Sequence, residues 1–209
     1  MTAARFWDRW AERYAAREIS DPQAYEEKLR RTQAHLRPDM VVLELGCGTG
    51  GTARRHAPIV ARYLATDASP EMIRIARGRM TDDSPSGLSF AVETVEEAIA
   101  DAGRKTDAPD AILALSLLHL LPDWRESLAG IARSLKPGGL FVSNTFCFRD
   151  SHPWLRWVSR PFQAAGLLPR FAHLREAELI AAIEAAGFHV LETWRPDRKA
   201  ALFVIARAR

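Results

Sequence analysis

The sequence predicts an α/β fold in which a mostly parallel β-sheet is covered by helices on both faces. Between residues 41 and 146, short β-branched runs alternate five times with amphipathic segments. Such alternation with short joins is typical of a parallel sheet whose crossovers are helices. The chain then ends in two adjacent strands, over 188–194 and 201–206. Their connection is too short for a parallel crossover, so the last strand is expected to run antiparallel.

The helix ends are predicted by capping residues. Aromatic residues at helical spacing over 6–14 predict an N-terminal helix. Asp21 and Ser69 each precede a proline, which is typical of an N-cap followed by the first helical position. Residues 94–97 predict a capping box, and Asp123 predicts a similar cap. A further helix is expected roughly over 175–186. The five parallel strands are expected at 41–45, 61–66, 88–93, 111–115 and 140–146.

Length and composition narrow the class of protein. The chain has 209 residues, of which 47% are hydrophobic and 26% charged, as in ordinary globular domains, and a single domain over 1–209 is expected. Its two cysteines exclude a disulfide-dense secreted domain and a four-thiolate zinc site. The N-terminus lacks the apolar region of a signal peptide, and the longest nearly apolar stretch, 111–121, is too short to span a bilayer. A cytoplasmic location is therefore expected.

Positive charge is concentrated in one segment. Residues 149–175 carry five arginines and one acid, while the whole chain has a formal net charge of only +3. A local field argues against a protein that coats nucleic acid. The same segment contains Trp154, Trp157 and Phe162, which favour an apolar wall for a small substrate over stacking on nucleic-acid bases. Transient contact with a membrane surface is the next alternative.

A glycine-rich turn and a distant acid predict a nucleoside-containing ligand. Gly46, Gly48 and Gly51 follow the first strand in a G-x-G-x-x-G pattern, and glycine suits a sharp turn that a ligand approaches closely. Asp67 lies 21 residues after Gly46, where a carboxylate accepts hydrogen bonds from both ribose hydroxyls. The alternative is a structural turn beside a surface aspartate. Glu44 would repel a phosphate but would suit an ammonium or sulfonium group.

Several motifs now resemble those of class I S-adenosylmethionine-dependent methyltransferases. Glu-x-Gly-x-Gly-x-Gly at 44–50 is similar to motif I of that family. Further similar segments are the ribose-binding segment at 64–72, the fourth-strand motif at 110–120, the Leu-Lys-Pro-Gly-Gly turn at 135–139, the entry to strand six at 185–188 and the N-terminal lid at 6–8 with 14–15. The resemblance implies a Rossmann-like three-layer sandwich with seven strands in the order 3-2-1-4-5-7-6. It also implies a helical lid over 1–38 and a substrate-lid insert over 147–174.

The resemblance assigns a cofactor site as well. It implies that S-adenosyl-L-methionine is the cofactor and that its methionyl, ribose and adenine parts contact different segments. The residues implied for the methionyl part are Glu44, Gly46, Cys47, Gly48 and Ser116; for the ribose, Asp67 and Ala68; and for the adenine, Met72, Glu93, Thr94 and Val95. Tyr14 is a candidate to close over the cofactor.

The function expected is methyl transfer to a small, hydrophobic or amphiphilic acceptor. The alternatives are an NAD(P)-binding oxidoreductase and a non-catalytic cofactor-binding protein. His119 is the best candidate for a general base because it follows strand four by a few residues. His152 and His173 flank the insert and are weaker candidates, whereas His35, His56 and His189 are interpreted as surface or edge residues.

Neither cysteine is expected to take part in the chemistry. Cys47 is interpreted as a small residue that fills the loop, because no histidine or acid pairs with it in the local sequence. Cys147 with His119 does not amount to a metal site. The oligomeric state is left open.

Overall fold

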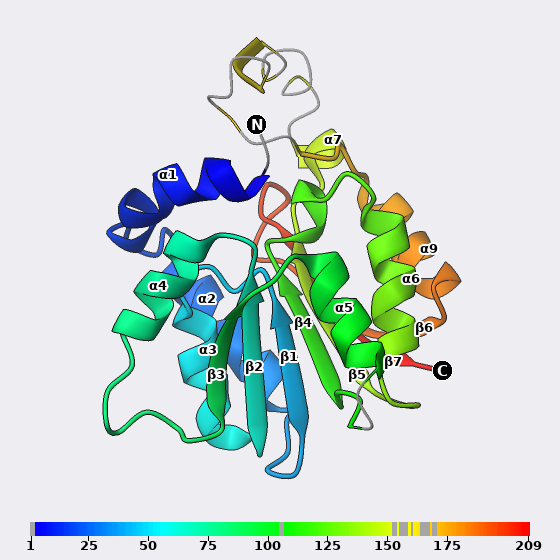
Figure 1. Ribbon diagram of the computed structural model, residues 1–209. Helices are drawn as coiled ribbons and strands as arrows, with labels where there is room; N and C mark the ends of the chain where they lie inside the picture. The colour runs from blue at the N-terminus through cyan, green and yellow to red at the C-terminus, as the bar shows by residue number, and fades with distance from the viewer. Residues whose placement is uncertain are drawn as a thin grey trace.

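Seven strands form one sheet in the order β3-β2-β1-β4-β5-β7-β6 (Figure 1). The structure is a computed structural model that describes residues 3–104, 107–151, 154, 159, 161–163, 168 and 171–209. The strands are β1 (Val41–Leu45), β2 (Arg62–Asp67), β3 (Leu88–Val92), β4 (Ala111–Leu115), β5 (Leu140–Thr145), β6 (Phe188–Trp194) and β7 (Leu202–Ala208). Both the strand order and the strand positions agree closely with the prediction.

The pairing confirms the parallel sheet and its antiparallel end. Leu43 of β1 lies between Leu64 of β2 and Ile112 of β4, and both pairings are parallel. β7 pairs antiparallel with both β5 and β6, and the β6–β7 register shifts between Val190 and Glu192. The five parallel strands therefore present their carboxyl ends at one edge of the sheet, where open α/β folds bind ligands.

Helices cover both faces of the sheet, giving three layers (Figure 1). One face packs against α5, α6 and α9, and the other packs against α3 and α4, with α2 beside α3. The helices are α1 (Ala3–Ala15), α2 (Pro22–Gln33), α3 (Gly51–His56), α4 (Pro70–Gly78), α5 (Val95–Arg104), α6 (Trp124–Ser134), α7 (Phe148–Ser151) and α9 (Glu176–Ala185), with the 3-10 turns η1 (Ala57–Ile59) and η2 (Leu118–Leu120).

Most of the predicted caps form. The Asp21 side chain accepts a hydrogen bond from the Ala24 amide at 2.9 Å, and the Ser69 hydroxyl accepts one from the Met72 amide at 3.2 Å. The capping box over 94–97 has both of its reciprocal bonds. Asp123 is the exception: it occupies the N-cap position of α6, but its side chain makes no capping bond, so the prediction located this helix start correctly and its contact wrongly.

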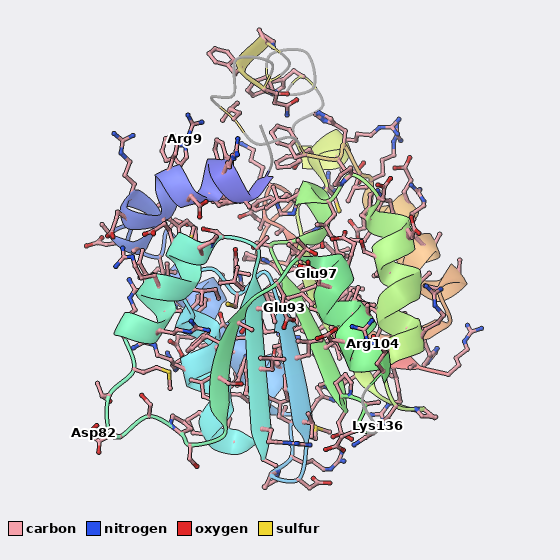
Figure 2. The ribbon with its side chains drawn as sticks, in the orientation of Figure 1. Arg9, Asp82, Glu93, Glu97, Arg104 and Lys136 are labelled. Carbon is pink, nitrogen blue, oxygen red and sulfur yellow. The ribbon has the colours of Figure 1, made fainter. Side chains whose placement is uncertain are left out.

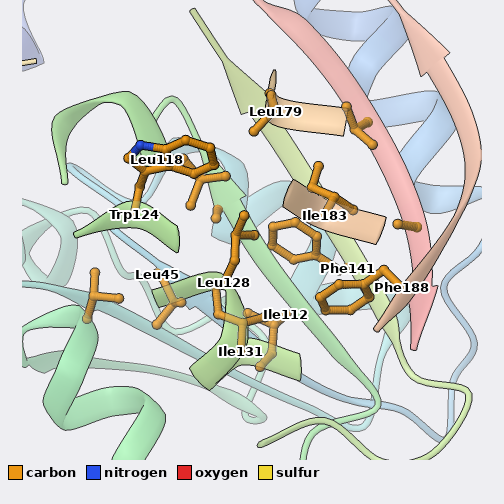
Figure 3. Close-up of a cluster of buried hydrophobic side chains, with 14 of the residues drawn as sticks. Leu45, Ile112, Leu118, Trp124, Leu128, Ile131, Phe141, Leu179, Ile183 and Phe188 are labelled. Carbon is orange, nitrogen blue, oxygen red and sulfur yellow. The ribbon is translucent and has the colours of Figure 1, made fainter. Parts of the chain in front are cut away.

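Two apolar clusters hold the layers together. Alternate residues of each central strand face opposite clusters: Ile112 belongs to the cluster under α5, α6 and α9 (Figure 3), and Leu113 belongs to the cluster under α3 and α4. Both residues are fully buried. Because both sheet faces are filled, the carboxyl edge of the sheet is the region left for chemistry.

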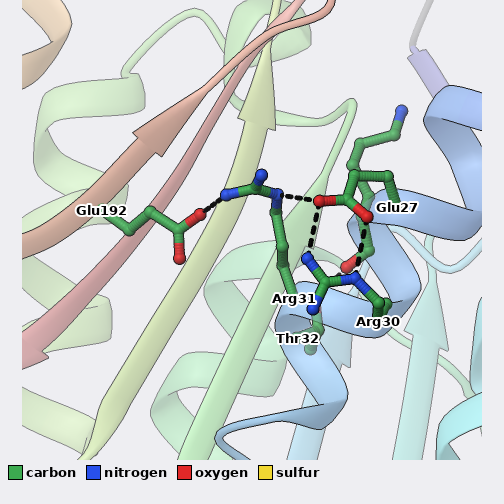
Figure 4. A network of polar contacts seen from close by, with 6 residues as sticks. Glu27, Arg30, Arg31, Thr32 and Glu192 are labelled. Carbon is green, nitrogen blue, oxygen red and sulfur yellow. Dashed lines mark hydrogen bonds and ion pairs between the residues drawn. The ribbon is translucent and has the colours of Figure 1, made fainter.

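Helix α2 is fastened across the second face to the far edge strand. Arg31 forms ion pairs with Glu27 of its own helix and with Glu192 of β6 (Figure 4). Its guanidinium also lies 5.0 Å from the ring centroid of Trp194. These contacts join helix α2 to β6, the strand at one edge of the sheet. Over the described part of the chain, none of the helices has the length and apolar character needed to cross a membrane.

Candidate active site

The glycine loop between β1 and α3 adopts the sharply turned, left-handed backbone conformation that its glycines predict. Gly46, Gly48 and Gly50 have φ values of 65°, 55° and 72°, a region that side-chain-bearing residues rarely adopt. The Cys47 amide donates to the Thr66 carbonyl of β2 at 2.9 Å, which pins the loop to the neighbouring strand. The loop therefore lies at the carboxyl ends of β1 and β2, with its glycines turned sharply.

The glycines differ in what surrounds them. A Cβ on Gly50 would lie 2.7 Å from the Phe90 ring, so that glycine serves packing. A Cβ on Gly46 would lie 2.7 Å from the Leu117 side chain, just beyond β4. A Cβ on Gly48 would meet only the Tyr14 ring, at 3.5 Å. Gly48 is thus the position where the backbone faces helix α1.

Asp67 ends β2 and accepts hydrogen bonds through both carboxyl oxygens. Oδ2 accepts from the Gly48 amide and Oδ1 accepts from the Ser69 amide, each at 2.9 Å. Burial raises the pKa of Asp67, and the two amide donors oppose that shift. Ala68 forms the half-buried turn between these contacts. The acid predicted from its spacing is therefore joined directly to the glycine loop.

Glu44 lies beneath the loop rather than on its surface. The residue is 2% exposed, and its Oε2 accepts a hydrogen bond from the Tyr63 hydroxyl at 2.8 Å. Burial raises the pKa of Glu44 to about 8, although the bond from Tyr63 lowers it. A buried acid of this kind is largely neutral near pH 7. A positive charge placed nearby would favour its ionised form.

Helix α1, for which a lid function stays a prediction, contacts this region through Tyr14. Tyr14 is half-exposed, and its ring lies against Gly48. The Tyr14 pKa is raised by burial and by the carboxylates of Asp67 and Glu44. Met72, at the start of α4, is 2% exposed.

The predicted adenine segment follows β3. The Glu93 amide donates to the Asp67 carbonyl at 3.1 Å, which holds the two strand ends together. Thr94 is exposed and caps α5, whereas the Val95 side chain belongs to the core, so only its backbone is available to a ligand. Glu93 and Glu97 lie toward the carboxyl ends of the strands, and Lys136 lies at the opposite end of the sheet (Figure 2).

Ser116 and Asn144 form a polar pair at the ends of β4 and β5. Among the described residues, Ser116 is the only one other than glycine with positive φ, at 57°. Its amide donates to the Asn144 carbonyl at 2.7 Å, and the Asn144 amide group donates to its hydroxyl at 3.2 Å. Asn144 Oδ1 is buried and has no hydrogen-bond partner within the described ranges. Asn144 was not predicted from the sequence, although an asparagine near the end of a buried strand is a signal for a site.

An aromatic cluster adjoins that pair. His119, in η2, packs edge-on against Phe146 and Phe148, with ring centroids 5.3 and 5.7 Å away. Phe148 also contacts Phe171 and His173. The two histidines were predicted as candidates from the sequence, but these three phenylalanines were not, because only the fold brings 146–148 and 171–173 together.

The environment of His119 constrains its chemistry. The residue is 5% exposed, and burial lowers its pKa to about 4. Its Nδ1 accepts a long hydrogen bond, at 3.5 Å, from the Phe146 amide. A neutral imidazole whose Nδ1 is an acceptor carries its proton on Nε2. In this state Nε2 is a hydrogen-bond donor, and the role of His119 as general base stays a prediction.

One expectation about a histidine is corrected, and Arg149 is found to donate to Glu178 of α9 at 2.9 Å. His56, interpreted as a surface or edge residue, is fully buried, because the last turn of α3 packs into the core. Both thiols are buried, and burial raises the pKa of Cys47 and of Cys147, which agrees with their assignment as structural residues.

Much of the insert falls outside the described residues. This applies to His152, Leu155, Arg156, Trp157, Val158, Arg160 and Arg170. Trp154 and Phe162 are described, and they are 57% and 47% exposed. A lid function for 147–174 and contact with a membrane surface therefore stay predictions.

Comparison with known proteins identifies the family. The methyltransferase domain family matches residues 10–193, which is most of the chain. The chain belongs to the class I S-adenosylmethionine-dependent methyltransferases. A ubiquinone biosynthesis O-methyltransferase of Xanthomonas oryzae pv. oryzae is 31% identical to this methyltransferase over 166 residues, 74% of this chain and 67% of that protein. Methyltransferase phqN of Penicillium fellutanum is 32% identical over 155 residues, 72% of this chain and 46% of that protein.

Solved structures confirm the fold of this methyltransferase. A methyltransferase solved in complex with the Trm112 activator of Haloferax volcanii has a TM-score of 0.73, with 23% identity, 100% of this chain and 99% of that chain covered. Magnesium protoporphyrin IX methyltransferase from Synechocystis, solved with bound S-adenosylhomocysteine, has a TM-score of 0.70 at 15% identity, with 99% and 97% covered. The oxidoreductase and non-catalytic alternatives are not favoured, and S-adenosylmethionine is the cofactor.

Proposed function

We propose that this methyltransferase transfers the methyl group of S-adenosylmethionine to a hydroxyl of a small, hydrophobic, aromatic acceptor. The observation that carries the proposal is the aromatic cluster of His119, Phe146, Phe148 and Phe171 at the carboxyl ends of β4 and β5. Flat apolar walls with a few polar groups suit an aromatic small molecule. The names of the ubiquinone biosynthesis O-methyltransferases support oxygen as the methylated atom.

The residues at the carboxyl edge of β1 and β2 fit the cofactor. Asp67 would hold the ribose, since each of its oxygens keeps a further lone pair besides the one used by an amide. Gly48 would let the ligand approach the backbone, because a Cβ there meets only Tyr14. Glu44 would respond to the positive charge of the methionyl part by losing its proton. The buried Asn144 Oδ1 offers a vacant acceptor for a ligand donor.

The protein's contribution to the reaction is alignment and exclusion of water. The cofactor supplies a methyl group on a sulfonium, which already carries a good leaving group. Rigid aromatic walls would fix the acceptor with its oxygen in line with that methyl group. His119 would orient the oxygen by donating from Nε2, a contact that also favours the more nucleophilic phenolate form. This arrangement suits an acidic hydroxyl better than an alcohol.

The proposal is tested by offering the purified protein tritiated S-adenosylmethionine with matched phenol, catechol, aniline, thiophenol and aliphatic alcohol acceptors. We expect label transfer to the phenolic or catecholic hydroxyls. Phe148→Ala should raise the acceptor KM about tenfold or more and leave S-adenosylhomocysteine affinity unchanged, because only the acceptor wall loses area. Preferential methylation of the amine or the thiol would reject the choice of oxygen.

His119 is tested separately with the same acceptors. If His119 is a general base, it is required for the methylation of every acceptor, and His119→Ala should lower kcat about 10²- to 10⁴-fold. As a hydrogen-bond donor, it should matter less, and kcat/KM of the wild type should rise with pH along the pKa of the acceptor itself. A pH profile with a single rise near 4, independent of the acceptor, would assign the base role to His119.

A further inference from the structure

The lid helix α1 and helix α4 run side by side in the same direction (Figure 1). Their contacts occur at three successive levels. At the first level Asp8 contacts the start of α4, at the second Glu12 pairs with Arg74, and at the third the end of α1 contacts Arg79. The lid is therefore attached along its length to α4, the helix that follows β2 and Asp67.

Arg79 makes the contact that reaches the glycine loop. It is the C-cap residue of α4. Its Nη2 donates to the carbonyl of Ala15, the last residue of α1, at 3.0 Å, and its Nη1 donates to the Thr49 hydroxyl at 2.9 Å. Carbonyls at a helix C-terminus lack helical partners and attract cations. One guanidinium thus spans the end of the lid and the loop that Gly48 and Gly50 shape.

The other end of the lid is linked through Ser69 to Asp67, the carboxylate proposed to hold the ribose. Asp8 Oδ1 accepts from the Ser69 hydroxyl at 2.6 Å and from the Glu71 amide at 3.3 Å. The Ser69 amide in turn donates to Asp67 at 2.9 Å. Between these two ends, Tyr14 lies against Gly48. The lid therefore cannot leave the loop without breaking contacts made by Asp8 and by Arg79.

We propose that Arg79 is a positioning residue that holds the lid closed on the cofactor and so sets the rate at which S-adenosylhomocysteine leaves. Each turnover ends with this product beneath α1, and release requires the lid to move away from the glycine loop. Arg79 touches neither reacting atom. It acts through Ala15 and Thr49. The inference rests on the cofactor placement proposed above and is independent of the acceptor.

The test measures S-adenosylhomocysteine release by stopped-flow tryptophan fluorescence, for which Trp7 and Trp10 on α1 serve as reporters. Arg79→Met should raise the dissociation rate about tenfold and change the association rate less than threefold. The dissociation rate of Arg79→Lys should fall between those of the wild type and Arg79→Met, because a single ammonium cannot bridge both acceptors as a planar guanidinium does. Arg55→Met is the matched control, since it removes an arginine that pairs with Glu26 of α2 and has no ion pair with α1 among the described residues.

Hydrogen exchange supplies a second readout. In Arg79→Met, amides of 3–15 should exchange faster, while those of β1 and β4 should be unchanged. A dissociation rate within twofold of the wild type would overturn the proposal, and so would an equal acceleration in Arg55→Met. Asp67→Ala separates the two levels of inference. If it binds S-adenosylhomocysteine normally, the cofactor placement fails; if it loses binding while Arg79→Met releases at the normal rate, only the role of Arg79 fails.

Discussion

Replacing Glu44 by glutamine should remove a destabilisation that grows as the pH rises. The carboxyl group is buried, and its pKa is raised from 4.5 to about 8. Between these two values the folded chain binds more protons than the unfolded chain, so the free energy of unfolding falls with increasing pH. The slope is about 1.36 kcal/mol per pH unit in the middle of the window and diminishes as pH 8 is passed.

The two pKa values give the size of the effect. Between pH 6 and pH 8.5, the wild type should lose about 2.5 kcal/mol of unfolding free energy relative to Glu44→Gln. The variant keeps an oxygen that accepts from the Tyr63 hydroxyl. The NH2 group of the glutamine changes the free energy of unfolding by an amount that does not depend on pH. The difference between the two proteins across pH therefore isolates the ionisation of this one group.

Urea denaturation of the cofactor-free protein at half-unit pH steps measures this difference. Tyr63→Phe is the matched control: it removes the hydrogen bond that favours the ionised carboxyl, so the folded pKa of Glu44 rises and the loss should continue to higher pH than in the wild type before it levels off. Parallel pH profiles for the wild type and Glu44→Gln would refute the reasoning, because they would mean that Glu44 is already ionised at pH 6.

Three further predictions concern other residues of the core and the site. His56 is fully buried and its pKa is lowered to about 4, so its stabilising effect is lost as the pH falls from 6.5 toward 4; the wild type should lose about 2 kcal/mol more than His56→Leu between pH 6.5 and 4.5, measured by urea denaturation. Gly48→Val should abolish S-adenosylhomocysteine binding in calorimetry while the chain still folds, with a Tm lowered by the strain of a β-branched residue at positive φ, whereas Gly50→Ala, whose Cβ would press on Phe90, should lower Tm by several degrees and keep measurable binding; the reverse pattern of binding would exchange their roles. Asp67→Ala should weaken S-adenosylhomocysteine about 30- to 1000-fold, and a change under threefold would reject the ribose contact.

The sequence by itself determined the architecture. β-branched runs, proline-marked helix starts and the short connection near residue 197 are local signals, and local sterics and hydrogen bonding decide what they form. The same holds for the glycine loop, since positive φ at Gly46, Gly48 and Gly50 is a property of the backbone of those residues. Asp67 was found because a fixed spacing along one β-α-β unit places it beside the loop.

Tertiary structure alone decided how the groups of the site are paired and buried. Glu44 meets Tyr63 because β1 and β2 align in register, and no local pattern indicates that burial will raise its pKa. The aromatic cluster around His119 combines segments more than 20 residues apart in the sequence, which only the packing of η2 against the end of β5 brings together. The bridge from Arg79 to the lid likewise depends on how α1 docks on α4. Long-range contacts of this kind are set by the packing of whole elements, so the identity of a single residue does not reveal them.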